Sequence, residues 1–490
     1  IGVNMKIEAK PAFLESLPQE VKARIAFNDR RNRDGSSGIL ISPQFKDVDD
    51  DAIKGFVKSL MASNRWTEKL LGIEEAQLSM LGPRSRAKPW NERKASLEEY
   101  YANKEYLTPD TLGDVTDGSL RPTTFEFAVN HLHRSSASGL PFLVRKGEAV
   151  DQGLHLKSES GEWPCMLYTR TQEDWKTRNV WGYPLADTIR ESRYHKPFLQ
   201  LEKTFAARKA LLGPEEVDRA ISQLVLGRRN NEAIVSVDFS AYDASVSPEL
   251  IRRAFARIAS TFQSRYQGEI LDVFKTFVTI PILTPSGLYS GQHGVPSGSS
   301  FTNTIDSLVQ LDVAKKFADK CQVQGDDGVY VVRDQDVERL HSDFEEAGLN
   351  VNSNKSEIFH SPEAVYLQRY YHPQYTNRQG VLSGVYPISR ALNRLKYLET
   401  FTDLDKVEMS GQDFFALRAI SILENCKHHP HFVDLVKYVH ELDKKNLSFN
   451  PASIVQYSKL NEPRARAGVF HEEAVDSLVG IRNFATYRIL

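Results

Sequence analysis

A segment with two adjacent aspartates between strand-forming residues places the strongest constraint on the fold of this 490-residue chain. The segment, residues 323–332, reads Val-Gln-Gly-Asp-Asp-Gly-Val-Tyr-Val-Val. Its second half has the β-branched and aromatic composition of a strand, and Gly325 and Gly328 flank the aspartates with residues that tolerate the dihedral angles of a tight turn. The segment therefore predicts a β-hairpin with Asp326 and Asp327 at its tip.

Adjacent carboxylates repel each other unless cations lie between them, so Asp326 and Asp327 are candidate metal ligands. Their oxygen atoms suit Mg²⁺, which proteins usually hold through one or two carboxylates together with substrate phosphates. The chemistry that this pair indicates is phosphoryl transfer. Asp-Gly and Gly-Asp pairs also form ordinary hairpin turns, so the segment taken alone leaves that interpretation open.

A second acidic site precedes the first by 88 residues. Residues 233–237 are predicted to form a buried strand that ends at Asp238, and Asp243 follows in a short loop. Ser247 and Pro248 then provide the N-cap and the first residue of a helix. A strand that ends in Asp238 beside the hairpin would bring three carboxylates together, as a site for two cations about 4 Å apart requires. A solvated loop aspartate is the alternative interpretation of Asp238.

Between the two acidic sites, a loop rich in glycine and serine (residues 290–300) leads into a predicted helix with one apolar face. Its small residues allow close approach to a phosphate or sugar, and the first N–H groups of the helix are available donors. The sequence contains no Gly-x-x-x-x-Gly-Lys-Ser/Thr pattern, so a P-loop nucleotide site is unsupported. Without context, a flexible linker is the simpler interpretation.

The order and spacing of these three elements resemble the palm motifs of viral RNA-dependent RNA polymerases. The matching residues are Asp238-x-x-x-x-Asp243 (motif A), Ser297-Gly298-x-x-x-Thr302 (motif B) and Gly325-Asp326-Asp327 (motif C). Further segments in the order typical of the family are Ser136-Ala-Ser-Gly139-Leu-Pro141 (motif G), 168–184 with Arg170, Lys176 and Arg178 (motif F), 337–356 with Lys355 (motif D) and 366–371 with Tyr366 and Arg369 (motif E). The amino-acid sequences of motifs B and F most resemble those of polymerases from bisegmented double-stranded RNA viruses, the picobirnavirus and partitivirus type.

The resemblance implies an α+β right-hand fold with fingers, a palm of antiparallel sheet plus helices, and a helical thumb. The expected segments are 1–80, an extension that bridges fingers and thumb; 81–225 and 259–290, the fingers; 226–258 and 291–375, the palm; and 376–490, the thumb and C-terminal tail. Apolar residues after Pro387 recur at helical spacing, which independently predicts helices there. Residues 372–386 and 450–490 are candidates for a segment that occludes the product channel, and nothing in them decides whether initiation needs a primer.

The resemblance also implies template-directed RNA synthesis from ribonucleoside triphosphates, with release of pyrophosphate, for viral genome replication and transcription. Asp238, Asp326 and Asp327 would hold two Mg²⁺ or Mn²⁺ ions, and Lys355 would be the general acid for pyrophosphate. Expected nucleotide-binding residues are Lys176, Arg178, Arg170, Asp243, Ser297, Thr302, Asn303 and Asp306. Expected RNA-binding residues are Ser136, Gly139, Pro141, Gly298, Tyr366 and Arg369.

Motif B departs from the family pattern at one position. Relatives commonly carry Asn four residues after the motif B Thr, whereas this chain carries Asp306. The change keeps an acceptor for the ribose 2′-OH and removes an amide donor. Asn303, about one turn earlier, is a candidate to share the task, so the choice among the ribose-selecting residues stays open. DNA-making relatives typically carry a bulky side chain at the Asp243 position, so the polar residue here favours ribonucleotides.

The charge balance requires any RNA path to be local. The chain has 62 basic and 64 acidic residues and a formal net charge of −2. Residues 165–210 carry nine Lys or Arg against five acidic residues. Aromatic residues among them, Trp175, Trp181, Tyr183 and Tyr194, suit stacking on single strands. A solvated helix face is the alternative for the part from 190 to 209.

Three separated cysteines without a Cys-x-x-Cys pair indicate neither a disulfide framework nor a zinc ribbon. Cys426, His428, His429 and His431 cluster in sequence, but no distant ligand pair accompanies them, and we expect no zinc. No apolar run approaches the roughly 20 residues that span a bilayer. We therefore expect a soluble protein of the virion interior or host cytoplasm.

Expected partners are RNA template and product, ribonucleoside triphosphates and, as a further candidate, a viral capsid protein, with the chain as a monomer. Two alternatives accompany this interpretation. One is a reverse transcriptase or another two-metal phosphoryl transferase. The other is a catalytically silent RNA-binding or capsid-tethered relative, which the presence of all candidate carboxylates and motif F cations does not favour.

Overall fold

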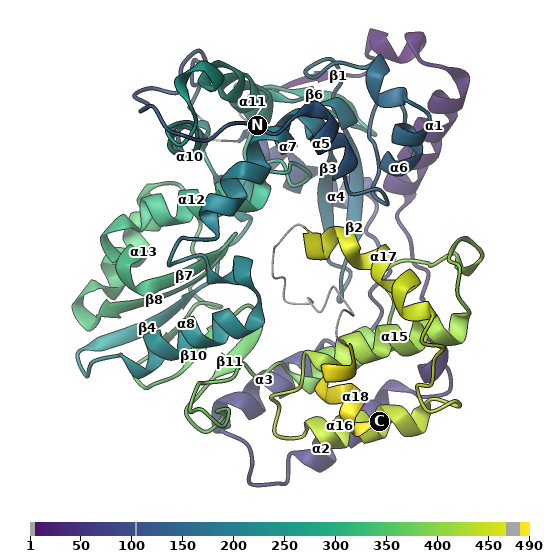
Figure 1. The fold of residues 1–490 in the computed structure, drawn as a ribbon, viewed down its shortest axis with the longest axis vertical. Coiled ribbons are helices and arrows are strands. Elements are labelled where there is room, and N and C mark those ends of the chain that lie inside the picture. The colour runs from purple at the N-terminus through teal and green to yellow at the C-terminus, as the bar shows by residue number, and fades with distance from the viewer. Residues whose placement is uncertain (1–4, 103–104, 467–480) are drawn as a thin grey trace.

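The acidic hairpin lies in a four-stranded antiparallel sheet with the strand order β7-β8-β4-β9 (Figure 1). The structure is a computed structural model that describes residues 5–102, 105–466 and 481–490. The strands are β4 (Glu232–Val237), β7 (Cys321–Gln324), β8 (Asp327–Arg333) and β9 (Glu357–Phe359). The predicted strand before Asp238 and the predicted hairpin around Asp326 are both confirmed.

Side chains of the two central strands alternate between two hydrophobic cores, as the two-residue period of a strand requires. Val235 and Tyr330 belong to the core that α10, α12 and α13 cover, whereas Ile234 and Val331 face the core formed with α8 and the hairpin β10–β11. These elements are α8 (Pro214–Leu226), α10 (Pro248–Ala259), α12 (Thr302–Val313), α13 (Val337–Glu346), β10 (Ala364–Tyr366) and β11 (Arg369–Tyr371). Burial on both faces fixes the register of β4 and with it the position of Asp238.

The helix α10 begins as the sequence predicts. The Ser247 hydroxyl accepts a hydrogen bond from the backbone N–H of Leu250 at 3.3 Å, and Pro248 is the first helical residue. The cap satisfies one of the N–H groups that every helix start leaves without a partner. The strand, the loop with Asp243 and this helix thus form one continuous unit.

A second sheet of five strands, in the order β1-β6-β5-β2-β3, forms the upper part of the molecule in Figure 1. Its members are β1 (Lys6–Glu8), β2 (Cys165–Thr171), β3 (Thr177–Gly182), β5 (Ile282–Thr284) and β6 (Gly287–Ser290). The strands β5 and β6 pair as an antiparallel hairpin. Helices near this sheet include α1 (Gln19–Asp34), α4 (Trp90–Glu98), α5 (Phe125–Asn130), α6 (Lys146–Asp151), α7 (Leu185–Glu202) and α11 (Gln267–Thr279).

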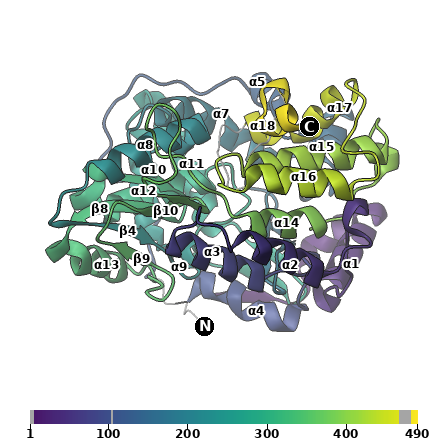
Figure 2. The same cartoon turned by 90° about the horizontal axis from the view of Figure 1, so that it is seen from below.

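The C-terminal third is helical, as its apolar spacing predicts. The helices are α14 (Ile388–Lys396), α15 (Gly411–Glu424), α16 (Phe432–Leu442), α17 (Ser453–Arg466) and α18 (Ala485–Ile489). Two N-terminal helices, α2 (Asp50–Leu60) and α3 (Glu68–Ser79), share a hydrophobic core with α14, α15, α16 and α18, and Figure 2 shows α2 and α3 beside α14. Residues 467–480 of the candidate C-terminal occluding segment lie outside the described residues. No helix in the described part of the chain is long and apolar enough to cross a membrane.

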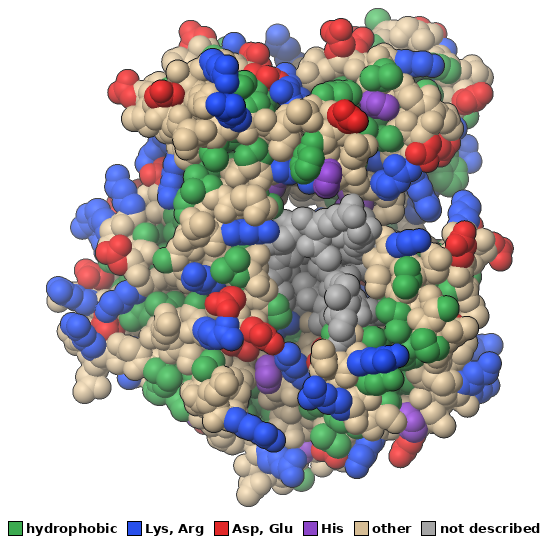
Figure 3. Space-filling view, viewed as in Figure 1, with side chains coloured by type: hydrophobic (Ala, Val, Ile, Leu, Met, Phe, Trp, Pro, Cys, Tyr) green, Lys and Arg blue, Asp and Glu red, His purple; other side chains and the backbone are tan. Residues whose placement is uncertain are grey.

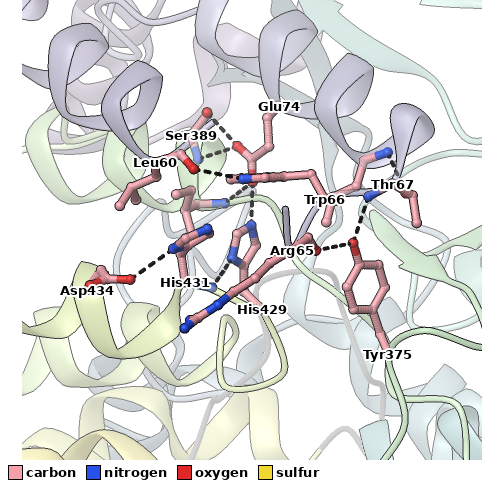
Figure 4. Close-up of polar contacts among 12 residues, drawn as sticks. Leu60, Arg65, Trp66, Thr67, Glu74, Tyr375, Ser389, His429, His431 and Asp434 are labelled. Carbon is pink, nitrogen blue, oxygen red and sulfur yellow. Dashed lines mark hydrogen bonds and ion pairs between the residues drawn. The ribbon is translucent and has the colours of Figure 1, made fainter. Parts of the chain in front are cut away.

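Buried polar contacts join the N-terminal segment to these C-terminal helices (Figure 4). The fully buried Glu74 carboxylate accepts hydrogen bonds from the backbone N–H groups of Ile388 at 2.8 Å and Ser389 at 2.9 Å, so it caps the start of α14. The Glu74 carboxylate also contacts the ring of His429, whose Nε2 lies 2.9 Å from it.

The neighbouring His431 completes this junction. Its ring lies stacked on Trp66 with centroids 5.2 Å apart, and its two nitrogens contact Ser63 at 2.7 Å and Asp434 at 2.9 Å. The histidine-rich segment thus forms hydrogen bonds across the junction. Within the described ranges, no three His, Cys, Asp or Glu side chains form a group that could hold a metal ion by themselves.

Candidate active site

The register of the palm sheet places Asp238 beside the acidic hairpin. Val237, which precedes Asp238, pairs with Gly328, which follows Asp327. Because the two strands run antiparallel, Asp238 and Asp327 lie at the same end of the sheet. The structure therefore brings together the two acidic sites that the sequence analysis singled out.

Two buried side chains of α12 hold the turn of the hairpin. The Ser307 hydroxyl accepts a hydrogen bond from the N–H of Gly325 at 2.8 Å, and Gln310 Nε2 donates to the Gly325 carbonyl at 2.9 Å. Ser307 and Gln310 are both fully buried and lie about one helical turn apart. Sequence reasoning missed both; the available signal was two polar residues next to the apolar ones that recur at helical spacing along α12.

Backbone and side-chain contacts with the segment after α13 hold Asp238 in place. Its N–H donates to Ser356 Oγ at 3.0 Å, and its carbonyl accepts from the N–H of Asn352 at 2.8 Å. Burial raises the pKa of the Asp238 carboxyl, while Lys355, Lys176 and a hydrogen bond from the Asn352 side chain oppose that shift. Two predicted cations thus act on the same carboxylate, and Asn352 and Ser356 are site residues that the sequence did not reveal.

Asp326 lies at the accessible tip of the hairpin in a strongly negative environment. Neighbouring protein atoms displace part of its hydration, and with the negative charge of Asp243 they raise the pKa of Asp326 to about 6. Arg178 opposes the shift, and Asp238 adds to it. A carboxyl in this setting favours a bound cation.

The carboxyls of Asp243 and Asp306 form a hydrogen bond with each other. Burial and the Asp243 charge raise the pKa of Asp306 well above its ordinary value, so Asp306 carries the shared proton and donates it to Asp243. The Asp306 side chain is only 5% exposed, and the Tyr242 hydroxyl fixes its backbone carbonyl at 2.8 Å. The protonated carboxyl thus provides Asp243 with a donor at the position where the motif B resemblance leads us to expect an asparagine amide.

The acidic residues suit a divalent cation that the substrate helps to hold. Asp238, Asp326 and Asp327 offer only oxygen ligands, the type that Mg²⁺ and Mn²⁺ prefer. Among the residues described here, no three such side chains lie close enough to hold an ion by themselves, so the convergence of the three carboxylates on shared ions stays a prediction. One Asp327 oxygen accepts a hydrogen bond from the N–H of Leu367 at 3.2 Å. A site with one or two carboxylates per ion, completed by phosphate, fits this arrangement.

The β2–β3 hairpin supplies cations to the acidic residues. Lys176 and Arg178 are exposed, and their charges act on Asp238 and on Asp326, respectively. Burial, Arg178 and Lys355 together lower the pKa of Lys176. Arg170 pairs with Arg178 in the strand register, and its Nε lies 3.7 Å from Glu399. Figure 3 shows Lys and Arg side chains interspersed with acidic ones over one face of the molecule. Positive charge beside the acidic residues is therefore local, and Lys176 and Arg178 contribute to it.

The glycine- and serine-rich loop packs closely on that hairpin. A Cβ on Gly298 would lie 1.6 Å from the carbonyl oxygen of Trp181, so only glycine fits there. Ser297 Oγ accepts a hydrogen bond from the N–H of Trp181 at 3.2 Å. The Thr302 hydroxyl donates to the carbonyl of Pro296 at 2.7 Å and so stabilises the loop itself. The loop is therefore a packed element rather than a flexible linker.

The motif G segment also packs against the end of β3. Gly139 has a φ of +65°, and a Cβ there would lie 2.5 Å from the Tyr183 carbonyl oxygen. Ser136 is partly exposed, its hydroxyl donates to the His133 carbonyl at 3.0 Å, and Pro141 is also partly exposed. These contacts position motif G beside motif F.

The structure does not present the motif E side chains to solvent. Tyr366 is fully buried, and Arg369 is only 5% exposed. The Arg369 guanidinium donates to the Leu367 carbonyl and to Asn425 Oδ1, both at 3.0 Å. The expectation that these two side chains contact RNA directly does not fit their burial; Arg369 instead joins β11 to the helix α15.

The expected stacking surface is largely wrong. Trp181 and Tyr194 are fully buried and Tyr183 is 3% exposed, because these rings pack in the cores around β3 and α7. Trp175 is partly exposed, and the Arg86 guanidinium lies 5.0 Å from its ring centroid. The aromatic residues among the motif F charges thus serve mainly to position the strand.

An acidic hairpin on a four-stranded palm sheet, faced by a basic hairpin and flanked by a helical thumb, is the arrangement of a right-hand nucleic acid polymerase. Residues 120–440 match the family model of viral RNA-dependent RNA polymerases, and the chain belongs to that family as an RNA-directed RNA polymerase.

Two curated relatives and one solved structure agree with this assignment. The chain is 26% identical over 454 residues to the potential RNA-dependent RNA polymerase of human picobirnavirus, covering 84% of each chain. It is 25% identical over 328 residues to the RNA-directed RNA polymerase of Cryptosporidium parvum virus 1, covering 59% of this chain and 60% of the relative. A crystal structure of the RNA-dependent RNA polymerase of a human picobirnavirus superposes with a TM-score of 0.83 at 23% identity, over 98% of this chain and 99% of that one. This match confirms the expected right-hand fold.

Proposed function

We propose that this chain synthesises RNA on an RNA template by nucleotidyl transfer at Asp238, Asp326 and Asp327. The observation that carries the proposal is the electrostatic arrangement of the site, in which Asp326 lies within the fields of Asp238, Asp243 and Arg178. Carboxylates with Lys176, Lys355 and Arg178 acting on them are suited to position a triphosphate and, together with its phosphates, to hold divalent ions. When bound, two Mg²⁺ or Mn²⁺ ions would activate the RNA 3′-oxygen and neutralise the triphosphate charge.

The cations around the carboxylates have distinct proposed tasks. Arg178 is suited to grip the triphosphate as a planar fork and Lys176 as a point charge. Lys355 is exposed and close enough to Asp238 to oppose the rise in its pKa, so it lies where a proton donor to the leaving pyrophosphate is needed. Arg170, which contacts Glu399, is more suited to joining the hairpin to the thumb side.

Ribose recognition is assigned to the group around Asp243. Asp243 accepts the proton of Asp306 and keeps lone pairs for a ribose hydroxyl. Ser297 and Gly298 shape the adjoining loop, and Thr302 holds it. Ser136, Gly139 and Pro141 are proposed to border the template path beside motif F.

The expected division of the chain into N-terminal extension, fingers, palm and thumb belongs to this proposal. The extension is suited to bridge fingers and thumb, because β1 pairs with β6 while α2 and α3 pack with the thumb helices. A monomeric state, a viral capsid protein as partner, and action in the virion interior or host cytoplasm complete the proposal.

Template dependence tests the proposal directly. The protein is incubated with a defined single-stranded RNA, all four ribonucleoside triphosphates and Mg²⁺ or Mn²⁺, with and without a primer. Product complementary to the template, and lost when the template or metal is omitted, is the expected result. Terminal addition that ignores the template sequence would contradict it. The unprimed arm shows separately whether initiation needs a primer.

A further inference from the structure

A fully buried arginine outside the sequence motifs links α7 to the active-site hairpin. Arg208 lies between α7 and α8 and is 0% exposed. Its Nε and Nη2 donate to the same Glu202 oxygen at 3.0 and 2.9 Å. A buried guanidinium is tolerated only when a partner charge and further acceptors satisfy it, so the rest of its contacts are informative.

The other contacts of Arg208 reach two catalytic motifs. Its Nη1 donates to the Val323 carbonyl at 2.9 Å and to Gln324 Oε1, which leads directly into the acidic turn. Its Nη2 donates to Asn303 Oδ1 at 2.8 Å, on the first turn of α12. One guanidinium therefore ties motif B to the strand that precedes Asp326.

This contact fixes which end of the Asn303 amide faces the active site. A guanidinium has no acceptor, so the Asn303 atom that it contacts must be the carbonyl oxygen. The amide nitrogen Nδ2 then points away from Arg208 and toward the hairpin, where a Cβ built on Gly325 would lie 3.3 Å from it. Asn303 is partly exposed, and Nδ2 donates to none of the residues that the structure describes.

A longer chain of hydrogen bonds supports Glu202 from the opposite side. Burial lowers the pKa of His195 to about 3, so its ring is neutral, and its Nε2 lies 3.0 Å from Thr304 Oγ1. The Thr304 hydroxyl in turn donates to the second oxygen of Glu202 at 3.0 Å. Both Glu202 oxygens are thereby engaged, which fixes the geometry of Arg208.

We propose that Asn303 Nδ2 donates a hydrogen bond to a ribose hydroxyl at the active site and that Arg208 is the residue that positions this donor. The proposal rests on the proposed function above. The Asp306 proton is used by Asp243, so that pair presents acceptors, whereas a hydroxyl both donates and accepts. Asn303 supplies the donor that the pair lacks. The hydroxyl is the 2′-OH of the incoming ribonucleotide or of the RNA 3′-terminal nucleotide, which must meet beside Asp326 for transfer to occur.

The experiment compares single-nucleotide incorporation by isosteric and truncated variants. Asn303→Asp keeps the oxygen for Arg208 and replaces the amide donor with an acceptor, whereas Asn303→Ala removes both. Arg208→Lys keeps a charge for Glu202 but loses the fork. Matched controls are Asn130→Ala on exposed α5 and Arg418→Lys, whose guanidinium contacts two thumb carbonyls.

Two sugar comparisons distinguish the source of the hydroxyl. One is the ratio of kcat/KM for a ribonucleotide to that for its 2′-deoxy analogue. The other compares an RNA primer with the same primer carrying a 2′-deoxy terminal sugar. Both Asn303 variants and Arg208→Lys are expected to lower one of these ratios by about tenfold, the loss typical of one hydrogen bond, while both controls keep the wild-type values.

An unchanged pair of ratios in both Asn303 variants would overturn the sugar contact. Wild-type ratios in Arg208→Lys, with a Tm loss no larger than that of Arg418→Lys, would overturn the positioning role. Should Arg208→Lys fail to fold, Glu202→Gln tests the same anchor with a milder change. Failure of the wild-type protein to make RNA would instead contradict the proposed function, and the two failures are therefore distinguishable.

Discussion

Gly298 and Trp181 lie so close together that a methyl group on Gly298 would sit 1.6 Å from the Trp181 carbonyl oxygen. The contact joins the motif B loop to the basic strand of motif F. Relief of such a clash requires the backbone to move, because neither group is the end of a flexible side chain.

Replacing Gly298 with alanine is therefore expected to lower RNA synthesis by on the order of a hundredfold, the loss that follows a displacement of about 1 Å in an active site. The matched control is Gly268→Ala in α11, where a Cβ meets nothing within 4 Å. That change is expected to leave synthesis unaltered and to stabilise the helix by roughly 0.5–1 kcal/mol. Primer extension and thermal unfolding of the two variants check both expectations. A fully active Gly298→Ala enzyme would contradict the account, because it would show that the loop backbone can move without loss of activity.

The Asp243–Asp306 pair predicts a specific response to pH. The pKa of Asp306 is raised by burial and by Asp243, so rising pH removes the shared proton and leaves two repelling carboxylates. In Asp306→Asn the amide donates to Asp243 at every pH. The variant is expected to retain synthesis and to lose less of it than the wild type as the pH rises. Parallel pH profiles at saturating nucleotide measure this, and identical profiles would argue against a shared proton.

The raised pKa of Asp326 predicts a metal requirement that depends on pH. Its pKa of about 6 means that protons compete with the cation as the pH falls through that value. The Mn²⁺ concentration for half-maximal synthesis is expected to rise about tenfold per pH unit below pH 6 and to change little above pH 7. Metal titrations at several pH values test this. A requirement that stays constant from pH 5 to 7 would remove Asp326 from the set of metal ligands.

Glu191 predicts how stability changes with pH. This carboxyl is 2% exposed under the motif B loop and accepts hydrogen bonds from Ser299 Oγ at 2.6 Å and the Ser300 N–H at 2.9 Å. Burial raises the pKa of Glu191 to about 8. The folded state therefore binds more protons than the unfolded state between about pH 4.5 and 8, so the free energy of unfolding falls as the pH rises through this range.

The expected slope for Glu191 is on the order of 1 kcal/mol per pH unit between pH 6 and 7. Glu191→Gln keeps the acceptor for Ser299 and has no charge to bury, so its stability is expected to vary less over this interval. Denaturant unfolding of both proteins at pH 6, 7 and 8 makes the comparison. Equal slopes in the two proteins would mean that Glu191 does not titrate as described.

The sequence predicted the elements whose signals are local. The buried strand over residues 233–237, the cap at Ser247 and the turn at Asp326 each depend on a few adjacent residues, and the structure confirms them. The resemblance to polymerase motifs then located the acidic site, because only carboxylate residues suit the metal binding expected there.

Contacts between distant parts of the chain were beyond sequence reasoning. Arg208 contacts Val323 across 115 positions, and Glu74 contacts His429 across 355 positions. Neither residue differs locally from a solvated charge, since only the folded chain shows its partners. For the same reason the aromatic Trp181 was misread as a stacking surface, although it belongs to a core.

The measurement that tests the central claim most directly is primed RNA synthesis by Asp238→Asn and Asp326→Asn, each beside Asp334→Asn. Asp334 follows β8 at the end opposite to the acidic turn, where it contacts His360, so its variant controls for the loss of one charge near the same strand. RNA affinity and unfolding temperature are measured for all three variants. Loss of synthesis in the first two, with RNA affinity and fold preserved and Asp334→Asn active, is the predicted result. Wild-type synthesis by either Asp238→Asn or Asp326→Asn would contradict the assignment of these carboxylates to catalysis.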